Sequence, residues 1–580
     1  MRKLLLTSLF IFTISFLFAQ EKDKLKTEEI VVEKPYTPTI TDAFKVNSNP
    51  SIDNSKATQK EKVSYSIFSI PVASTFAPDK GKAKNMERGP KESIYQNYVS
   101  VGFGMYMSPL IEAFIHTNTD KTNDFGIFVN HYSSNGGLDD VKLDNNFSTT
   151  NIDLYYKKIE KYYSWQANAG LKRNQVNYYG LPKNHLFTDA ALNTIDEKQA
   201  YKNLYVGGKI NFDESIFKGA AVKLETFSDE YNSSEFRFVA KPMVEFPIAS
   251  EKITSEFLLD IVSGKFKNDY YTNSTIKNSF FNLGAFPNFE INRDNLSINL
   301  GAKLYYSNDL ERKINEFYAY PNVTASVKII DDVFILVAGL TGDLIQNTYN
   351  NFAEENPYVS PTLSILQTDK QYNAFVGAKG KLASNVSYHF TLSQSSEKGK
   401  ALFKLNEPLT DGTIILEKAY QAGNSFGVVY DDVKTLQFLG GITVNISKEL
   451  NLSGEVSAAN YDTTIEEETW NLPKLTASIS GDYQQKKWFA GAQLFLRGET
   501  KDLMQSFNDP LSSYFPTAPT IVKNDGYLDL NLKAGYNFSE RLTAFAKINN
   551  ALGSDYDQYT SYKVQPFVAL AGITYKFDLK

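Results

Sequence analysis

Apolar and polar residues alternate with a period of two from about Tyr98 to the end of the chain. Successive side chains of a β-strand point to opposite faces of its sheet, so each alternating run predicts a strand with one apolar and one polar face. Segments 436–446 and 567–577 show this pattern, and so does segment 527–538. One face of 527–538 carries Leu528, Leu530, Leu532, Ala534, Tyr536 and Phe538, and the other carries Asp529, Asn531, Lys533, Gly535 and Asn537.

The length of these runs distinguishes a membrane barrel from a soluble β-sandwich. Strands of a sandwich average about five or six residues. The runs here reach about ten residues, the length that crosses a bilayer when a strand is tilted. The apolar face suits hydrocarbon and the polar face suits a watery lumen. After the N-terminus the sequence has no run of 18 or more apolar residues, so we expect it to cross a membrane with strands.

Short polar turns alternate with long polar connections along this region. The asymmetry is typical of outer-membrane barrels, whose periplasmic turns are short and whose outer loops are long. Ten short hairpins, with a first and a last strand, predict an all-β fold: a closed antiparallel transmembrane barrel of about 22 strands, in a range of 20 to 24. The expected short turns lie near 118–122, 157–162, 212–217, 248–253, 291–296, 329–333, 382–386, 447–450, 484–487 and 538–541, and the expected long connections near 132–146, 174–200, 344–370, 396–423 and 499–523.

The N-terminus has the pattern of a secretory signal. Arg2 and Lys3 precede the apolar run Leu4–Phe18, and cleavage is expected after Ala19. An uncleaved membrane anchor is the alternative, but the run is short for one. We therefore expect a signal peptide at 1–19, and the protein in the outer membrane of a Gram-negative bacterium.

Residues 20–95 differ in composition from the barrel region 96–580. They are rich in Lys, Glu, Ser, Asn and Pro and show no sustained period. We expect an irregular periplasmic or lumenal segment, because Pro interrupts regular structure. Two islands, Thr27–Val32 and Tyr65–Val72, could each add a strand to a partner sheet.

The composition excludes several classes of protein. The 580 residues include 36 Tyr and 41 Phe but no Cys, and the mean hydropathy is −0.33. Without Cys the chain has no disulfide framework, thiolate zinc site, catalytic thiol or lipid-modified cysteine. A net charge of −6 argues against nucleic-acid binding, which requires a basic face.

Candidate catalytic residues are few. Of the four histidines, His389 shares a strand face with Ser387, which invites a nucleophile interpretation. Residues two apart on a strand point the same way about 7 Å apart, however, and no orienting acid is evident. Polar lumen residues are the better explanation, and we predict that the chain is not an enzyme. The other three histidines are His116 near a strand end, His131 at an outer rim and His185 in a long connection.

Two acidic groups could suggest a metal site. Asp139, Asp140 and Asp144 share one expected outer loop, and 466–468 is a run of three Glu. Calcium prefers several such oxygen ligands, but neither spacing is that of an EF-hand. Solvated loop charge is the simpler interpretation, so we expect no metal, no cofactor and no catalytic residues. The loop aromatics Tyr178, Tyr179, Phe187, Tyr349, Phe352 and Tyr358 are expected to pack loop against loop or to lie in the membrane girdle, more than to stack on sugars.

The C-terminal region resembles that of TonB-dependent receptors. Asn549-Asn550-Ala551-Leu552 is followed by Tyr556, Pro566 and a last strand, 572–577. This resembles the closing pattern of the family over about the last 55 residues. The resemblance implies a 22-strand barrel that transports a ligand, and Tyr575 and Phe577 as the C-terminal signal read by the barrel-insertion machinery. The Phe-Ala-Gln ending of the signal peptide also resembles proteins of Bacteroidetes-type bacteria.

The chain departs from that family at its N-terminus. About 75 residues separate the signal peptide from the first strand, and they lack the turns of a plug sheet, so we expect no full plug domain. Glu29, Ile30, Val31 and Val32 resemble a TonB box, the strand that pairs with a TonB-type energising protein; the alternative is a chance run of β-branched residues. A barrel of 22 strands cannot fill its own lumen. The N-terminal segment, the outer loops or a partner must therefore block it.

Two functions from different classes follow. The first is a TonB-dependent-receptor-like barrel for uptake of a ligand across the outer membrane. The alternative is a non-transporting barrel subunit that scaffolds an envelope assembly, secretion or adhesion complex. The expected partners are outer-membrane lipid, the insertion machinery, and either a TonB-type protein or a membrane complex, with no nucleic acid.

Overall fold

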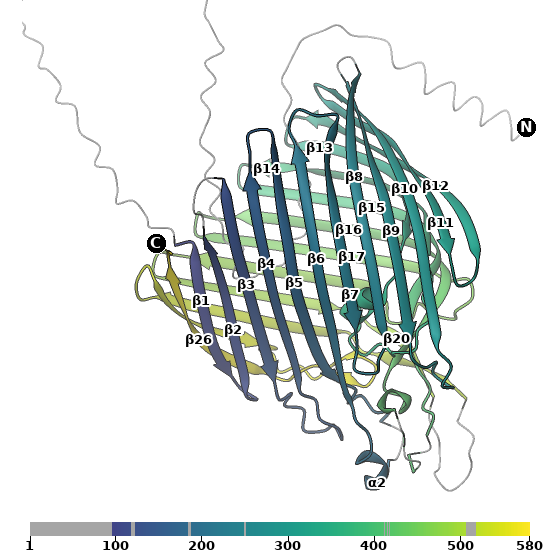
Figure 1. Cartoon of the computed structure of the whole chain (residues 1–580). Coiled ribbons are helices and arrows are strands. Elements are labelled where there is room, and N and C mark those ends of the chain that lie inside the picture. Colours follow the sequence, from purple (N-terminus) through teal and green to yellow (C-terminus); the bar gives the residue numbers. More distant parts are fainter. Residues whose placement is uncertain are drawn as a thin grey trace, which may run out of the picture. The chain divides into compact units, whose positions relative to one another are not determined.

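The fold is a single closed barrel. The computed structural model describes residues 95–117, 122–183, 187–248, 251–410, 412–413, 416, 418–505 and 518–579. Twenty-two strands form one antiparallel sheet, in which the first strand pairs with the last, and the ring is closed (Figure 1). The predicted signal peptide 1–19, almost all of the segment 20–95 and the segment Glu29–Val32 lie outside the described residues. Among the described residues, no helix is long and apolar enough to span a membrane.

Two small hairpins and short helices lie in the long connections, apart from the barrel sheet. The barrel strands are β1(Asn97–Gly104), β2(Ser108–Thr117), β3(Asn123–Ser134), β4(Phe147–Ile159), β5(Tyr163–Asn177), β6(Lys198–Phe212), β7(Phe217–Ser228), β8(Ser234–Ile248), β9(Glu251–Phe266), β10(Ile276–Arg293), β11(Leu296–Asp309), β12(Ile314–Ile330), β13(Phe334–Ile345), β14(Thr368–Ala383), β15(Val386–Leu405), β16(Phe426–Asn445), β17(Leu450–Asp462), β18(Leu475–Gln484), β19(Trp488–Arg497), β22(Tyr527–Asn537), β23(Leu542–Asn549) and β26(Val568–Phe577). The other elements are the hairpins β20(Thr500–Met504)–β21(Thr520–Asn524) and β24(Asp557–Tyr559)–β25(Tyr562–Lys563), the helices α2(Asp189–Leu192) and α3(Tyr349–Glu355), and the 3-10 turn η2(Ala419–Gln421).

The sequence prediction of about 22 strands is confirmed. Each of the ten expected short turns falls between two paired strands, at the end of the barrel where both β1 begins and β26 ends. The long connections lie at the other end, drawn lowest in Figure 1. The connection expected at 396–423 is shorter than predicted, because β15 continues to Leu405. A register shift between Glu397 and Lys400 interrupts the alternation there, and the sequence pattern stops before the strand does.

The two faces of the sheet are as the alternation predicts. On the outer surface Phe438 is 40% exposed, Leu436 50% and Ile442 45%. The inner surface is polar: the Arg237 guanidinium contacts the Asp260 carboxylate at 2.7 Å. An apolar outer belt and a polar lumen are what a barrel in a bilayer requires.

The ring closes at a seam where side chains are small. Val101 of β1 lies opposite Ile573 of β26 on the outer face, and Gly102 lies opposite Gly572 on the inner face. The Phe545 ring from β23 lies over both glycines, so that a Cβ atom at Gly572 would stand 2.5 Å from its Cζ. An aromatic ring covering glycines on adjacent strands fixes register and removes the exposed backbone that glycine leaves.

Candidate functional site

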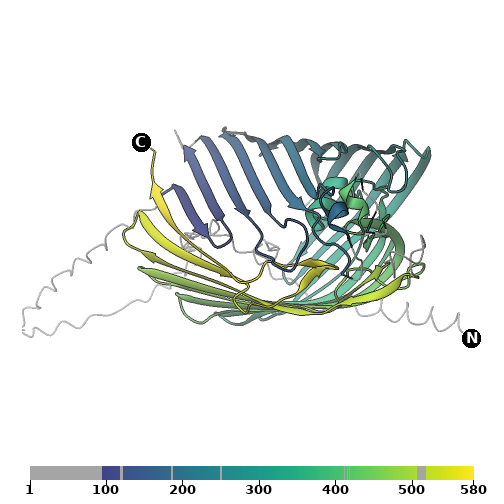
Figure 2. The same ribbon diagram turned by 90° about the horizontal axis from the view of Figure 1, so that it is seen from below.

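Five long connections meet at the outer mouth of the barrel. They are 178–197, 346–367, 406–425, 498–526 and 550–567, and we call their described residues the loop cap. Figure 2, which looks onto this end, shows their coils and helical turns inside the outline of the strands. In the ring of 22 strands, β5 and β15 are ten strands apart, so the loops that follow them leave opposite walls. Their meeting therefore bridges the mouth.

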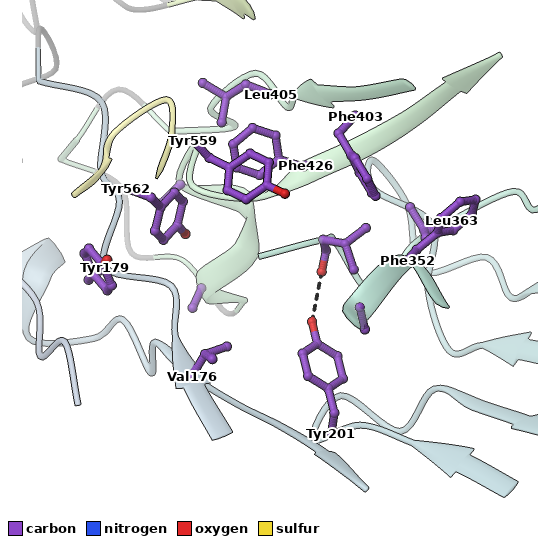
Figure 3. Close-up of a cluster of buried hydrophobic side chains, with 14 of the residues drawn as sticks. Val176, Tyr179, Tyr201, Phe352, Leu363, Phe403, Leu405, Phe426, Tyr559 and Tyr562 are labelled. Atoms are coloured by element: carbon purple, nitrogen blue, oxygen red, sulfur yellow. Dashed lines mark hydrogen bonds between the residues drawn. The ribbon is translucent and has the colours of Figure 1, made fainter. Parts of the chain in front are cut away.

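The loop cap has its own aromatic core, drawn in Figure 3. The Tyr358 and Tyr562 rings stack with their centroids 3.5 Å apart. The Tyr349 ring packs edge-to-face on Phe227 of the barrel wall, with the centroids 5.1 Å apart. Tyr349, Val359 and Phe426 are at most 1% exposed. The prediction that the loop aromatics pack against each other is thus confirmed for Tyr178, Tyr179, Phe187, Tyr349, Phe352 and Tyr358.

Tyrosine hydroxyls join the loops to one another. Tyr178 donates to the carbonyl of Val359 at 2.8 Å, Tyr179 to that of Lys563 at 2.7 Å, and Tyr559 to that of Glu355 at 2.8 Å. Burial raises the pKa of the Tyr178 and Tyr179 phenols well above its usual range, so both remain neutral donors. Loop carbonyls that water cannot reach are satisfied in this way, which a buried loop requires.

Asp502 connects the β20–β21 hairpin to other parts of the outer rim. It lies on β20, is 0% exposed, and accepts hydrogen bonds from Leu405 N at 2.9 Å, Asn471 Nδ2 at 2.8 Å and Thr560 Oγ1 at 3.2 Å. Each donor belongs to a different connection or strand end. Burial raises the pKa of the Asp502 carboxyl to about 6, although these hydrogen bonds lower it. The carboxylate ties the β20–β21 hairpin to three other parts of the outer rim.

A second carboxylate holds α3 against the wall. Glu235 of β8 accepts from the backbone N–H groups of Tyr349 at 2.7 Å and Asn350 at 3.3 Å, which open this helix. Helix N-termini leave such N–H groups without intrahelical partners. Between α3 and the lumenal side of β5–β7 lies a cavity of about 70 Å³ bordered by Lys172, Asn203 and Glu354, among others. This space suits a few water molecules rather than a large ligand.

The acidic groups noted in the sequence serve as ties between loops. Asp140 pairs with Lys563, Glu466 pairs with Lys404 at 2.8 Å, and Glu468 pairs with Lys501. The interaction with Lys563 holds the pKa of the Asp140 carboxyl below its usual range. Within the described residues, no three His, Asp or Glu side chains gather as a metal site.

The histidines are not arranged for nucleophilic chemistry. His389 lies opposite Gly441 and Ser387 opposite Thr443 along β15 and β16, and no hydrogen bond between the two is found. A different histidine has a carboxylate beside it: His116 Nδ1 lies 3.0 Å from Asp124 Oδ1. His131 Nδ1 lies 2.8 Å from Thr150 Oγ1, and His185 lies outside the described residues.

The residues of the closing pattern have identifiable tasks in the 550–567 connection. Asn550 has a φ of 47° and receives Ser554 N at 3.0 Å on its side-chain oxygen, which forms the turn after β23. Asn tolerates this left-handed conformation better than most residues. Tyr556 stacks on Tyr527 at 3.8 Å and donates to Asp529 at 2.7 Å. These two contacts hold the beginning of the 550–567 connection against β22.

The outer belt and the closed ring define a transmembrane barrel of the class found in Gram-negative outer membranes. No family model matches the chain, and no curated protein matches it. Among solved structures, it is similar to the pyoverdine outer membrane receptor FpvA of Pseudomonas aeruginosa PAO1 bound to pyoverdine, with 13% identity, a TM-score of 0.60, and 84% of this chain and 79% of that chain covered.

Two further structures show the same likeness. The siderophore receptor PiuA of Acinetobacter baumannii has 10% identity and a TM-score of 0.58, covering 84% of this chain and 82% of that one. The ferric-catecholate import receptor Fiu of K12 E. coli has 11% identity and a TM-score of 0.58, with 84% and 82% covered. At these identities the likeness is one of fold.

Proposed function

We propose that this chain is a TonB-dependent-receptor-like barrel that takes up a ligand across the outer membrane. The observation that carries the proposal is the closed 22-strand ring whose outer mouth is bridged by folded loops. A ring of this width needs something in its mouth if it is not to leak. Solved receptors with the same architecture, named for pyoverdine, siderophores and ferric catecholate, support uptake as the purpose.

In this proposal energy arrives through Glu29–Val32 by strand addition to a TonB-type protein. Main-chain hydrogen bonds supply the affinity in such pairing. Val31→Pro removes one main-chain donor and should abolish capture of the periplasmic TonB-type domain by the full-length barrel, whereas Val31→Ala keeps the donor and should bind within a fewfold of wild type. Surface plasmon resonance of detergent-solubilised protein measures both. Equal binding by all three proteins contradicts energised transport, and a stoichiometric envelope partner co-purified in its place supports the scaffold alternative.

We also propose that Tyr575 and Phe577 form the C-terminal signal for insertion. Their rings point outward from β26 and stack at 6.2 Å, although three residues follow them. Phe577→Ala should lower the fraction of chains that reach the heat-modifiable folded form severalfold, measured by gel shift of membranes. Leu579→Ala, a comparable truncation two residues later, is the control. An equal yield of the two variants would remove the assigned role.

A further inference from the structure

Three rows of outward-facing side chains cross β6 to β10 near their outer ends. Strand register aligns each row across five neighbouring strands. The row nearest the membrane centre is Val206, Leu224, Phe238, Ile261 and Phe281. The middle row is Leu204, Thr226, Phe236, Ser263 and Ser279. The outermost row is Lys202, Ser228, Ser234, Lys265 and Lys277.

Toward the outer ends of these strands, the outward-facing side chains change from apolar to basic within four residues. The first row is wholly apolar, the second mixes hydroxyls with Leu204 and Phe236, and the third has three lysines and two serines. Aromatic residues such as Phe236, which is 38% exposed, mark the interface of a barrel with its bilayer. The third row therefore lies at the level of the lipid headgroups of the outer leaflet.

Two of the three lysines in the third row have no ion pair with another described residue. Lys265 and Lys277 lie directly opposite each other across β9 and β10, an arrangement that destabilises a sheet when both are charged. Both are exposed, and neither has an ion pair within the described part of the chain. Lys202 has Glu230 at 3.7 Å, a loose and exposed pair. At the far end of the middle row, Glu311 accepts from Ser279 at 3.3 Å.

A recess coincides with the two polar rows. It is open to solvent and has a volume of about 390 Å³. The hydroxyl groups of four Ser and Thr side chains line the recess together with Lys265, and each hydroxyl can donate a hydrogen bond to an anion. The outward-facing residues that border it are Thr226, Ser228, Ser234, Phe236, Ser263 and Lys265. Phe227, Glu235 and Gly264, the intervening residues of the same strands, complete the lining, and the Glu235 carboxylate accepts hydrogen bonds from the start of α3.

We propose that this row and recess bind the anionic, phosphate-bearing headgroup of an outer-leaflet lipid. Lysine ammonium groups and hydroxyls are natural partners of phosphate oxygens. Four strand spacings give the row a length of about 19 Å, enough for several headgroup contacts. A lipid is favoured over free phosphate because the apolar rows begin directly beneath and can hold its acyl chains. The proposal does not depend on whether the barrel transports a ligand.

Native mass spectrometry of the full-length protein in neutral detergent tests the assignment. Dioctanoyl phosphatidic acid is the probe, with dioctanoyl phosphatidylcholine and inorganic phosphate as separate arms. Lys265→Gln/Lys277→Gln should bind the phosphatidic acid about 25-fold more weakly than wild type, because each lysine contributes roughly a factor of five near an anionic headgroup. Lys486→Gln/Lys487→Gln removes the same charge from the exposed β18–β19 turn and should bind as wild type.

Three results would overturn the proposal: equal affinity of the double variant and wild type, an equal loss in the turn control, or inorganic phosphate bound as tightly as the lipid. A heat-modifiability gel shows that each variant is folded. If the double variant fails to fold, Lys277→Gln should still lose affinity severalfold and Lys277→Arg should restore it. Failure of that rescue also contradicts the assignment.

Discussion

Replacing Phe438 with arginine is expected to destabilise the folded barrel by about 2–4 kcal/mol, the cost of arginine on a lipid-facing strand near the middle of the bilayer. The same replacement at Gln437, the preceding residue, should cost far less. Phe438 is 40% exposed on the outer face, with Leu392 and Ala458 as strand neighbours. Gln437 faces the lumen, where its amide donates to Ser457 Oγ at 2.9 Å.

Urea unfolding of the two variants in phosphatidylcholine vesicles, followed by the fluorescence of the three tryptophans, measures the difference. The two positions are adjacent in one strand and receive the same new residue, so the variants differ in the face that carries the arginine and in the residue that it replaces. Equal losses for the two variants would mean that the faces of β16 are not lipid and water. The transmembrane assignment of the strand would then be wrong.

The barrel was predictable because its main constraint is local. Hydrocarbon on one side and water on the other impose alternation on every strand, and alternation is visible in a single sequence. Leu528, Tyr536 and Phe538 were assigned to one face of one run, and all three are exposed on the outer surface. The predicted end of a strand is wrong where a bulge interrupts the alternation, as between Glu397 and Lys400 of β15.

The loop cap and the outermost row of β6 to β10 cannot be predicted from the alternation, because both depend on contacts between distant segments. Asp502 lies in the expected 499–523 connection, where Thr500–Met504 forms a strand although its residues do not alternate between apolar and polar. Thr560, one of the hydrogen-bond partners of Asp502, is 58 residues away. Lys265 and Lys277 are unremarkable in sequence, and only the register of β9 with β10 brings them face to face.

Asp502→Ala is expected to open the loop cap without unfolding the barrel. The change leaves the buried Leu405 N–H without its acceptor and removes one of the two acceptors of Asn471 Nδ2, which also donates to the Phe403 carbonyl. Thr560 Oγ1 keeps Asn524 Oδ1 as an acceptor. Each buried donor left without a partner costs about 1–3 kcal/mol. A total of about 3 kcal/mol corresponds to a hundredfold or greater rise in the population of open loops. Hydrogen exchange of peptides from 405–410, 471–474 and 556–563 should accelerate accordingly, while β10 and β16 peptides keep wild-type rates, because loops can open separately from the wall.

The same carboxylate should make the stability of the cap depend on pH. Its pKa is about 6 in the folded cap and 3.8 in an exposed reference, so the folded cap binds the proton more tightly. Stability from this group is therefore full below about pH 4 and is lost as the pH rises through about 6, a change on the order of 3 kcal/mol. The charged groups nearby are the Lys501–Glu468 pair, Arg497, which donates to the Asn471 carbonyl, and Glu355, whose pKa burial also raises. Asp502→Asn keeps the shape but does not titrate, so exchange corrected for intrinsic rates should depend less on pH in this variant than in wild type. An identical pH dependence in the two proteins would assign the effect to Glu355 or another group instead.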